Sequence, residues 1–101
     1  MPKGYVIMTE AIRDEAAMGA YGQASFPTVQ QHGGSVIIAY DDPEILEGSW
    51  HGTRTVVIKF DSVSAAHGWY RSAEYQAARA IREDAAEVNV VIVGGFEMPT
   101  G

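Results

Sequence analysis

The sequence predicts a small α+β protein in which four strands and two helical regions follow the order β-α-β-β-α-β. Apolar, β-branched runs recur along the chain and are expected to be its strands: Gly4–Thr9, Ser35–Tyr40, Arg54–Phe60 and Val88–Val93. Stretches rich in helix-forming residues separate the first run from the second and the third from the fourth. A chain of 101 residues is long enough for one domain, which we expect to span residues 1–101.

The first helix is expected at Arg13–Gln31. Asp14 and Glu15 would stand in its first turn, where acidic side chains complement the positive end of the helix dipole. Pro27 cannot donate a backbone hydrogen bond, so we expect a kink or a second short helix near Ser25–Phe26. A pair of glycines then ends the helix.

The second helical region is expected in two parts. Asp61 or Ser62 would cap a helix over Val63–Tyr70. Ser72 is a second candidate cap, so the helix should break there and restart over Ala73–Ala86, which is rich in alanine, arginine and glutamate.

The two central strands are joined by Asp41-Asp42-Pro43, which is typical of a turn, and by the more polar stretch Glu44–Trp50. We expect Glu44–Trp50 to be extended, as a continuation of the second strand or as a short hairpin. The complete order is typical of the ferredoxin-like plait, an antiparallel four-stranded sheet with both helical regions on one face.

The strands are apolar on both faces, although the helices can cover only one. In the second strand Val36, Ile38 and Tyr40 alternate with Ile37 and Ala39, and the last two strands show the same pattern. Such a sheet would leave an exposed apolar patch, which monomers rarely tolerate. A second copy packed sheet against sheet is the simplest cover, so we expect a homodimer through the open sheet face. The alternative is a monomer whose short strands alternate poorly.

Composition excludes several classes of protein. The chain has 13 acidic and 7 basic residues, a net charge of −6, which argues against a nucleic-acid partner. It has no cysteine, so disulfides, thiolate metal sites and a cysteine nucleophile are excluded. No apolar run is long enough for a membrane span, and Met1-Pro2-Lys3-Gly4 lacks the layout of a signal peptide. We therefore expect a cytoplasmic protein without membrane contact.

The sequence gives little support for a metal site, a haem site or a nucleophilic serine. The histidines His32, His51 and His67 do not pair at metal-ligand spacing, so no metal site is expected. Haem has no identifiable axial ligand beyond His67, the nearest candidate, and no cofactor is expected. Ser72 is better explained as a helix cap than as a nucleophile.

A family resemblance is carried by residues spread along the chain: Asp14, Tyr21, Gly33-Gly34, Glu47-Gly48-x-Trp50-x-x-x-Arg54, Phe60-x-Ser62-x-x-x-Ala66-x-x-Trp69-Tyr70-x-Ser72-x-Glu74-Tyr75, and Arg82. Together they make the chain resemble the domain-of-unknown-function 1330 family over nearly its entire length, most specifically from Trp69 to Tyr75. Members often have proline where this chain has Ala73, a departure that concerns only the helix restart.

The resemblance implies a ferredoxin-like fold of the dimeric α/β-barrel group, a homodimer whose two sheets form a barrel. It implies no reaction. Relatives in that fold group include cofactor-independent monooxygenases, muconolactone isomerase-like proteins and stress-responsive barrel proteins, and the fold alone cannot choose among them.

An aromatic and polar constellation is the candidate site. The substrate-binding candidates are Trp50, Arg54, Trp69, Tyr70 and Tyr75, and the candidates for catalysis are Asp14, Tyr21 and Arg82. Asp14 and Tyr21 are seven residues apart, as are Tyr75 and Arg82, which places each pair on one helix face. We expect one cavity per subunit, with His51 or Arg54 at its mouth, surrounded by Asp14, Tyr21, Trp69, Tyr75 and Arg82.

Two functions are consistent with such a site. The first is binding of a small apolar or aromatic oxo compound between sheet and helices, with a cofactor-independent monooxygenase- or isomerase-like activity in which an arginine holds an anion and Asp or His carries a proton. The alternative is a non-catalytic small-molecule-binding or stress-associated dimer. In a purely structural reading the aromatics are core, and an Asp14–Arg82 pair or a pair between Glu74 and an arginine joins their polar ends.

Overall fold

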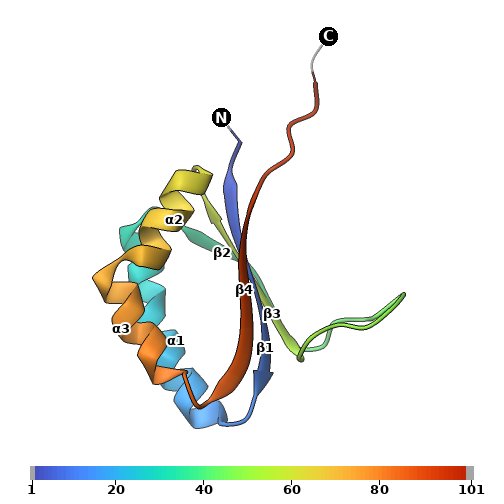
Figure 1. Ribbon diagram of the computed structural model, residues 1–101, viewed down its shortest axis with the longest axis vertical. Helices are drawn as coiled ribbons and strands as arrows, with labels where there is room; N and C mark the ends of the chain where they lie inside the picture. The colour runs from blue at the N-terminus through green and yellow to red at the C-terminus, as the bar shows by residue number, and fades with distance from the viewer. Residues whose placement is uncertain (1, 100–101) are drawn as a thin grey trace.

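The computed structural model describes residues 2–99 (Figure 1). Within this range the chain forms four strands and three helices: β1 Gly4–Ile12, α1 Glu15–Gln31, β2 Ser35–Tyr40, β3 Arg54–Phe60, α2 Val63–Arg71, α3 Ala73–Ile81 and β4 Ala86–Gly94. None of these helices is long and apolar enough to cross a membrane.

The strands form one antiparallel sheet in the order β2-β3-β1-β4. α1 connects β1 to β2 past β3, and α2 with α3 connects β3 to β4 past β1. The helices lie together on one face of the sheet and leave the other face uncovered (Figure 1). This is the predicted ferredoxin-like α+β plait, and within the described chain the sheet is not closed into a barrel.

β1 is longer than the sequence predicts. It continues beyond Thr9 to Ile12, because its whole length pairs with β4, from Gly4 opposite Gly94 to Ile12 opposite Ala86. The same pairing lengthens β4 at both ends. Strand length is therefore decided here by the partner strand rather than by local composition.

α3 is shorter than predicted, ending at Ile81 instead of Ala86. The turn that follows is held against the end of β1, because the Ala85 carbonyl accepts backbone hydrogen bonds from Arg13 at 2.7 Å and from Asp14 at 3.0 Å. These two bonds anchor the turn at the junction of β1 and α1, and the chain leaves the helix before it.

α1 runs through Pro27 as one helix, so the separate short helix expected near Ser25–Phe26 is not formed in the described chain. Pro27 lies on the exposed side of α1, and so does Gln23, whose carbonyl loses its helical donor. Water can satisfy an exposed carbonyl, which is why the proline is tolerated.

The predicted caps of the second helical region are confirmed at two serines. The Ser62 hydroxyl oxygen accepts a hydrogen bond from the backbone N–H of Ala65 at 3.0 Å. The Ser72 hydroxyl oxygen accepts one from the N–H of Tyr75 at 3.2 Å, and the helix breaks there as expected.

Residues 41–53 form a long loop without strand pairing, so the expectation of a strand or hairpin at Glu44–Trp50 is wrong. The loop projects from the sheet on the side away from the helices (Figure 1). It returns to β1 at Gly52, which has a φ of +70° and where a Cβ would overlap the carbonyl of Glu10. The Thr53 N–H donates to that carbonyl at 3.0 Å. Only glycine combines this φ with so close an approach.

The core lies on the helix-covered face. Alternation along β1 directs Val6, Met8 and Glu10 to this face. Their partners on β3 share it: Ile58, Val56 and Arg54. The largest fully buried side chains are Trp69, Tyr75, Phe60, Met8 and Val6.

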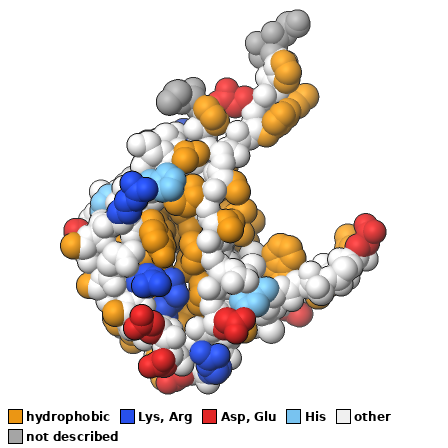
Figure 2. Space-filling view, in the orientation of Figure 1, with side chains coloured by type: hydrophobic (Ala, Val, Ile, Leu, Met, Phe, Trp, Pro, Cys, Tyr) orange, Lys and Arg blue, Asp and Glu red, His pale blue; other side chains and the backbone are white. Residues whose placement is uncertain are grey.

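The other side of the sheet, called the open face below, is formed by the intervening strand residues, which include Ile7, Ile38, Val57, Val91 and Val93. Ile38 is 46% exposed and Val91 51%. Hydrophobic side chains lie on both sides of the strands in the space-filling view (Figure 2). Both faces are apolar, as the sequence predicts, and the helices cover one of them.

Candidate functional site

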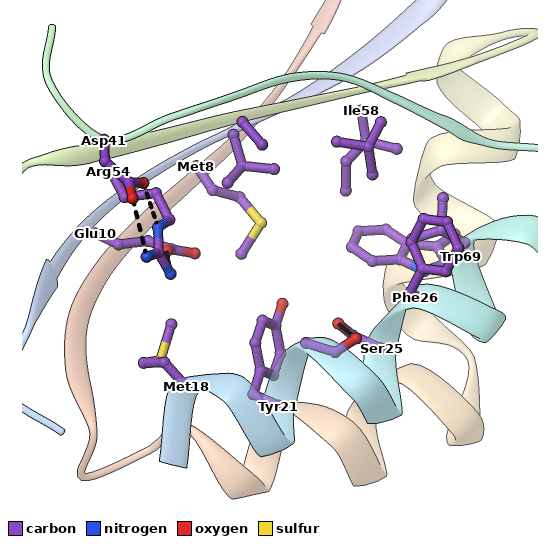
Figure 3. A pocket seen from close by; sticks show the side chains of 15 residues that line it. Met8, Glu10, Met18, Tyr21, Ser25, Phe26, Asp41, Arg54, Ile58 and Trp69 are labelled. Atoms are coloured by element: carbon purple, nitrogen blue, oxygen red, sulfur yellow. Dashed lines mark hydrogen bonds and ion pairs between the residues drawn. The ribbon is translucent and has the colours of Figure 1, made fainter. Parts of the chain in front are cut away.

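A cavity of about 400 Å³, called the α1 cavity below, lies between α1 and the helix-covered face of the sheet. Its apolar walls come from five elements and include Met8 of β1, Met18 of α1, Val36 of β2, Ile58 of β3 and Trp69 of α2. These side chains point into one space (Figure 3). A cavity of this size with apolar walls is typical of sites for small organic molecules.

One end of the α1 cavity is polar (Figure 3). Arg54 reaches it from β3, and its Nε donates a hydrogen bond to Asp41 Oδ1 at 2.7 Å. The same guanidinium lies 3.7 Å from Glu15 Oε2 and 4.0 Å from Glu10 Oε1. The hydrogen bond from Arg54 holds the pKa of Asp41 below its ordinary value. The Arg54 guanidinium therefore already has three carboxyl groups of the protein itself around it.

Glu10 is the buried acid of this end. The residue is 2% exposed, and within residues 2–99 its carboxyl makes no hydrogen bond. Burial raises the pKa of the Glu10 carboxyl, and the nearby charges of Arg54 and Arg82 oppose that rise without cancelling it. A carboxyl in this environment can hold, donate or accept a proton near a bound molecule.

Tyr21 of α1 lines the cavity and connects it to a polar network behind its wall. Its hydroxyl lies 2.9 Å from the Tyr75 hydroxyl, and Arg82 Nη2 donates to Tyr75 at 3.3 Å. The Arg82 guanidinium carbon stands 5.4 Å from the centre of the Tyr21 ring. Burial is the main cause of a strongly raised pKa of Tyr21, so this hydroxyl keeps its proton.

Trp69 is held rigidly at the other end of the cavity. Its indole Nε1 donates to Thr28 Oγ1 at 3.0 Å, and that hydroxyl donates to the Ser25 carbonyl at 2.6 Å. Its ring packs against Tyr75 and Phe60 with centroids 4.1 and 5.5 Å away. The indole therefore presents a fixed apolar wall.

The structure brings together part of the predicted constellation. Tyr21, Arg54 and Trp69 line the α1 cavity, with Arg54 at its polar end. Tyr75 and Arg82 lie directly behind Tyr21 and do not line it.

Other predicted residues lie elsewhere. Asp14 is exposed and caps α1, accepting a hydrogen bond from the Ala17 N–H at 3.1 Å, so the expectation that it faces the cavity is wrong. The seven-residue argument failed because a cap residue lies outside the helical repeat. Neither an Asp14–Arg82 pair nor a Glu74–arginine pair forms among the described residues.

Trp50 and His51 lie on the open-face side of the sheet, not at the cavity. Trp50 Nε1 donates to Thr55 Oγ1 at 3.0 Å. His51 bridges Thr9 Oγ1 at 2.8 Å and Glu87 Oε1 at 3.1 Å. Both belong to the loop of residues 41–53, whose path turns away from the helices (Figure 1).

Tyr70 lies at a second, more open cavity of about 490 Å³ between α2 and β4, where it is joined by His67, Arg71, Val90, Val91 and Ile92. Tyr70 also packs against Tyr75 with ring centroids 5.4 Å apart. No group of three or more potential metal-ligating side chains converges in residues 2–99.

Glu10 was missed because the first strand was predicted to end at Thr9. The signal was present in the alternation: Val6, Met8 and Glu10 occupy every second position, so a strand continued by one residue puts Glu10 on the core face. A glutamate in that pattern indicates a buried acid.

Comparison with solved structures shows the same fold in proteins of low sequence identity. A protein of unknown function from Rhodopseudomonas palustris has a TM-score of 0.79 and 19% identity, covering 96% of this chain and 85% of that one. A "dimeric protein of unknown function and ferredoxin-like fold" from Bacteroides fragilis has a TM-score of 0.62 and 14% identity, covering 91% and 95%. A Nitrosomonas europaea protein titled "Putative antibiotic biosynthesis monooxygenase" has a TM-score of 0.54 and 22% identity, covering 100% and 97%.

No curated protein matches the chain. The sequence profile of one family, described as "Domain of unknown function (DUF1330)", matches residues 3–96 and so includes every strand and helix described above. This chain therefore belongs to the DUF1330 family.

Proposed function

We propose that this protein binds a small apolar or aromatic oxo compound in the α1 cavity and works as a homodimer joined through the open face. The observation that carries the binding proposal is the pairing of apolar walls with one polar end in a cavity of about 400 Å³. Such a site accommodates an apolar body and orients a single oxygen function.

Each part of the site has a distinct role in this proposal. Trp69, Met8 and Met18 contact the apolar body of the ligand, and the rigidly held indole of Trp69 sets its orientation. The oxo group lies at the polar end, beside Glu10 and Arg54. Tyr21 separates this end from the buried Tyr75–Arg82 network.

A second candidate function, cofactor-independent catalysis, is favoured by Glu10. A buried carboxyl with a raised pKa at the polar end of a substrate-sized cavity is suited to proton transfer to or from an oxo compound. Turnover of a bound ketone or quinone, followed by mass spectrometry, separates an enzyme from a binding protein.

The homodimer proposal is supported by the exposed apolar surface of the open face. The tip of the 41–53 loop and the segment after β4 add Leu46 and Phe96, which are 83% and 82% exposed. A stable interface needs roughly 1,600 Å² of buried surface, and a sheet face packed on its copy is of that order. The Bacteroides fragilis neighbour is described as dimeric.

The binding test uses acetophenone, a small aromatic ketone, as the probe. Trp50→Phe leaves Trp69 as the remaining tryptophan of two, so quenching then reports on the cavity wall. We expect saturable quenching in this background, confirmed by isothermal titration calorimetry.

Two glycines of α1 provide a matched pair of variants for that test. Gly22 lines the cavity and Gly19 does not, and a Cβ at either position meets nothing within 4 Å. Gly22→Phe should therefore fill the cavity and weaken acetophenone binding at least about tenfold, whereas Gly19→Phe should bind normally. Equal acetophenone binding by the two variants would show that the ligand does not occupy the α1 cavity, and would overturn the proposal.

A further inference from the structure

The polar end of the α1 cavity holds a buried acid without a hydrogen-bond partner. Glu10 is 2% exposed, and its carboxyl faces the cavity (Figure 3). Its nearest cation is Arg54, whose Nη1 is 4.0 Å from Glu10 Oε1, which is too far for a hydrogen bond. The carboxyl therefore keeps its hydrogen-bonding capacity directed toward the cavity, where a ligand can use it.

The cations near Glu10 are engaged mainly with other groups, although among the described residues Arg54 Nη1 makes no hydrogen bond and Arg82 Nε is buried without a partner. Arg54 gives its short hydrogen bond to Asp41 at 2.7 Å and lies 3.7 Å from Glu15. Arg82 stands behind the Tyr21 ring and donates to Tyr75. The charges of Asp41 and Glu15 also act on Glu10 and raise its pKa further.

This balance of charge disfavours an anionic ligand. At the polar end the Arg54 guanidinium lies against the carboxylates of Asp41 and Glu15, so an added carboxylate would meet two like charges even when Glu10 is protonated. A neutral ligand avoids that repulsion. Its carbonyl oxygen has lone pairs but no proton, so it needs a donor, and a carboxylic acid can supply one.

We propose that the α1 cavity selects neutral oxo compounds, such as ketones, quinones or lactones, by a hydrogen bond from the protonated carboxyl of Glu10 to the ligand oxygen, and that it rejects the corresponding carboxylates. The proposal rests on the function proposed above and names its ligand class. Burial favours the neutral acid, because the raised pKa keeps the proton on Glu10 to higher pH than on an exposed glutamate.

The pH dependence follows from the role of that proton. At low pH Glu10 is protonated and donates to the carbonyl. As the pH rises through the raised pKa, the carboxyl becomes a carboxylate that repels the carbonyl oxygen, so ketone binding weakens. A single hydrogen bond of this kind corresponds to a loss of about fivefold to tenfold in affinity.

The experiment compares acetophenone with benzoate, which has a similar ring and a negative charge. Affinities are measured by calorimetry and by Trp69 quenching in the Trp50→Phe background, from pH 5 to pH 9. We expect acetophenone to bind at least about tenfold more tightly than benzoate at pH 5, because only the anion is repelled by Asp41 and Glu15. Acetophenone binding should weaken with rising pH.

Two replacements of Glu10 isolate the donor. Glu10→Gln keeps an N–H donor without a charge, so ketone binding should persist and lose its pH dependence. Glu10→Leu removes both donor and charge, so ketone binding should be weak at every pH. Thermal unfolding checks that each variant is folded, and Glu10→Gln also controls for titration of other groups.

The outcomes separate the two proposals. One outcome supports the binding site alone: acetophenone and benzoate bind equally, Gly22→Phe weakens the binding of both, and the Glu10 variants leave it unchanged. The cavity is then a binding site, and the neutral-ligand inference is wrong. Phenol, which can donate a hydrogen bond, serves as a third probe. If phenol binds more tightly as the pH rises, Glu10 acts as an acceptor and the inference is also wrong. If neither probe binds any variant, the proposed function itself fails and the inference fails with it.

Discussion

The two faces of the sheet use neighbouring residues of the same strands for different purposes. On the helix-covered face, Trp69 and Tyr75 are buried to 0% exposure, and the polar groups of that core are directed toward one another or into a cavity. On the open face, Val91 stays 51% exposed, and His51 ties the loop to β1 and β4. The helix-covered face thus carries the proposed ligand site and the open face the proposed interface, although both are built from neighbouring residues of the same strands.

Adjacent positions of β3 allow one charge to be placed on each face of the sheet. Ile58 is 3% exposed beneath the helices, and Val57 faces the open side. Ile58→Asp should unfold the subunit, because burying an unpaired carboxylate costs several kcal/mol, on the order of the whole stability of a small domain. Val57→Asp should leave the subunit folded and convert a dimer to a monomer.

Circular dichroism and sedimentation velocity check this pair of variants together. A folded Ile58→Asp would contradict the assignment of the core face. A Val57→Asp protein that sediments like the unmodified chain would show that the open face is not the interface.

A second contrast uses the two tryptophans. Trp69→Ala should lower the free energy of unfolding by roughly 3–5 kcal/mol, because it empties the centre of the aromatic core. Trp50 is 50% exposed, and Trp50→Ala should lower it by about 1 kcal/mol or less. Urea denaturation measures both values, and similar losses would contradict the difference in packing between the faces.

Glu10 predicts an effect of pH on stability. Burial raises its pKa in the folded state, so the stabilisation by the neutral acid is complete below the unfolded pKa and is lost as the pH rises through the folded pKa. Each unit of that rise costs about 1.4 kcal/mol of folding free energy above the folded pKa. Glu10→Gln should therefore raise the melting temperature at pH 7 and above but not below pH 4. A Glu10→Gln protein less stable than the original at pH 7 would show that the charge is compensated.

The smallest expected effect belongs to Asp14. Asp14→Ala should lower the free energy of unfolding by about 1 kcal/mol through loss of the α1 cap, and leave acetophenone binding unchanged. Asp14→Asn, which can cap equally well, should restore most of the stability. If both variants keep their stability but lose acetophenone binding, Asp14 is part of the functional site after all.

The candidate site could be predicted only in part. Tyr21 and Trp69 were identified because buried aromatic side chains with polar groups need partners, and Arg54 was expected at the mouth of the cavity. Glu10 was missed at a strand end, and His51 was placed on the wrong side of the sheet because the path of a glycine-containing loop has no periodic signal.

By itself the sequence determined the order of the elements, the bounds of β2 and β3, and the serine caps, because these depend on residue types within a few positions of one another. The tertiary structure alone decided where β1 and α3 end and which side chains share a cavity. The pairing of β1 with β3 sets Glu10 opposite Arg54, residues far apart in the chain. No local sequence pattern predicts that Glu10 lies opposite Arg54, because the register depends on which strands pair and on which face of the sheet the helices cover.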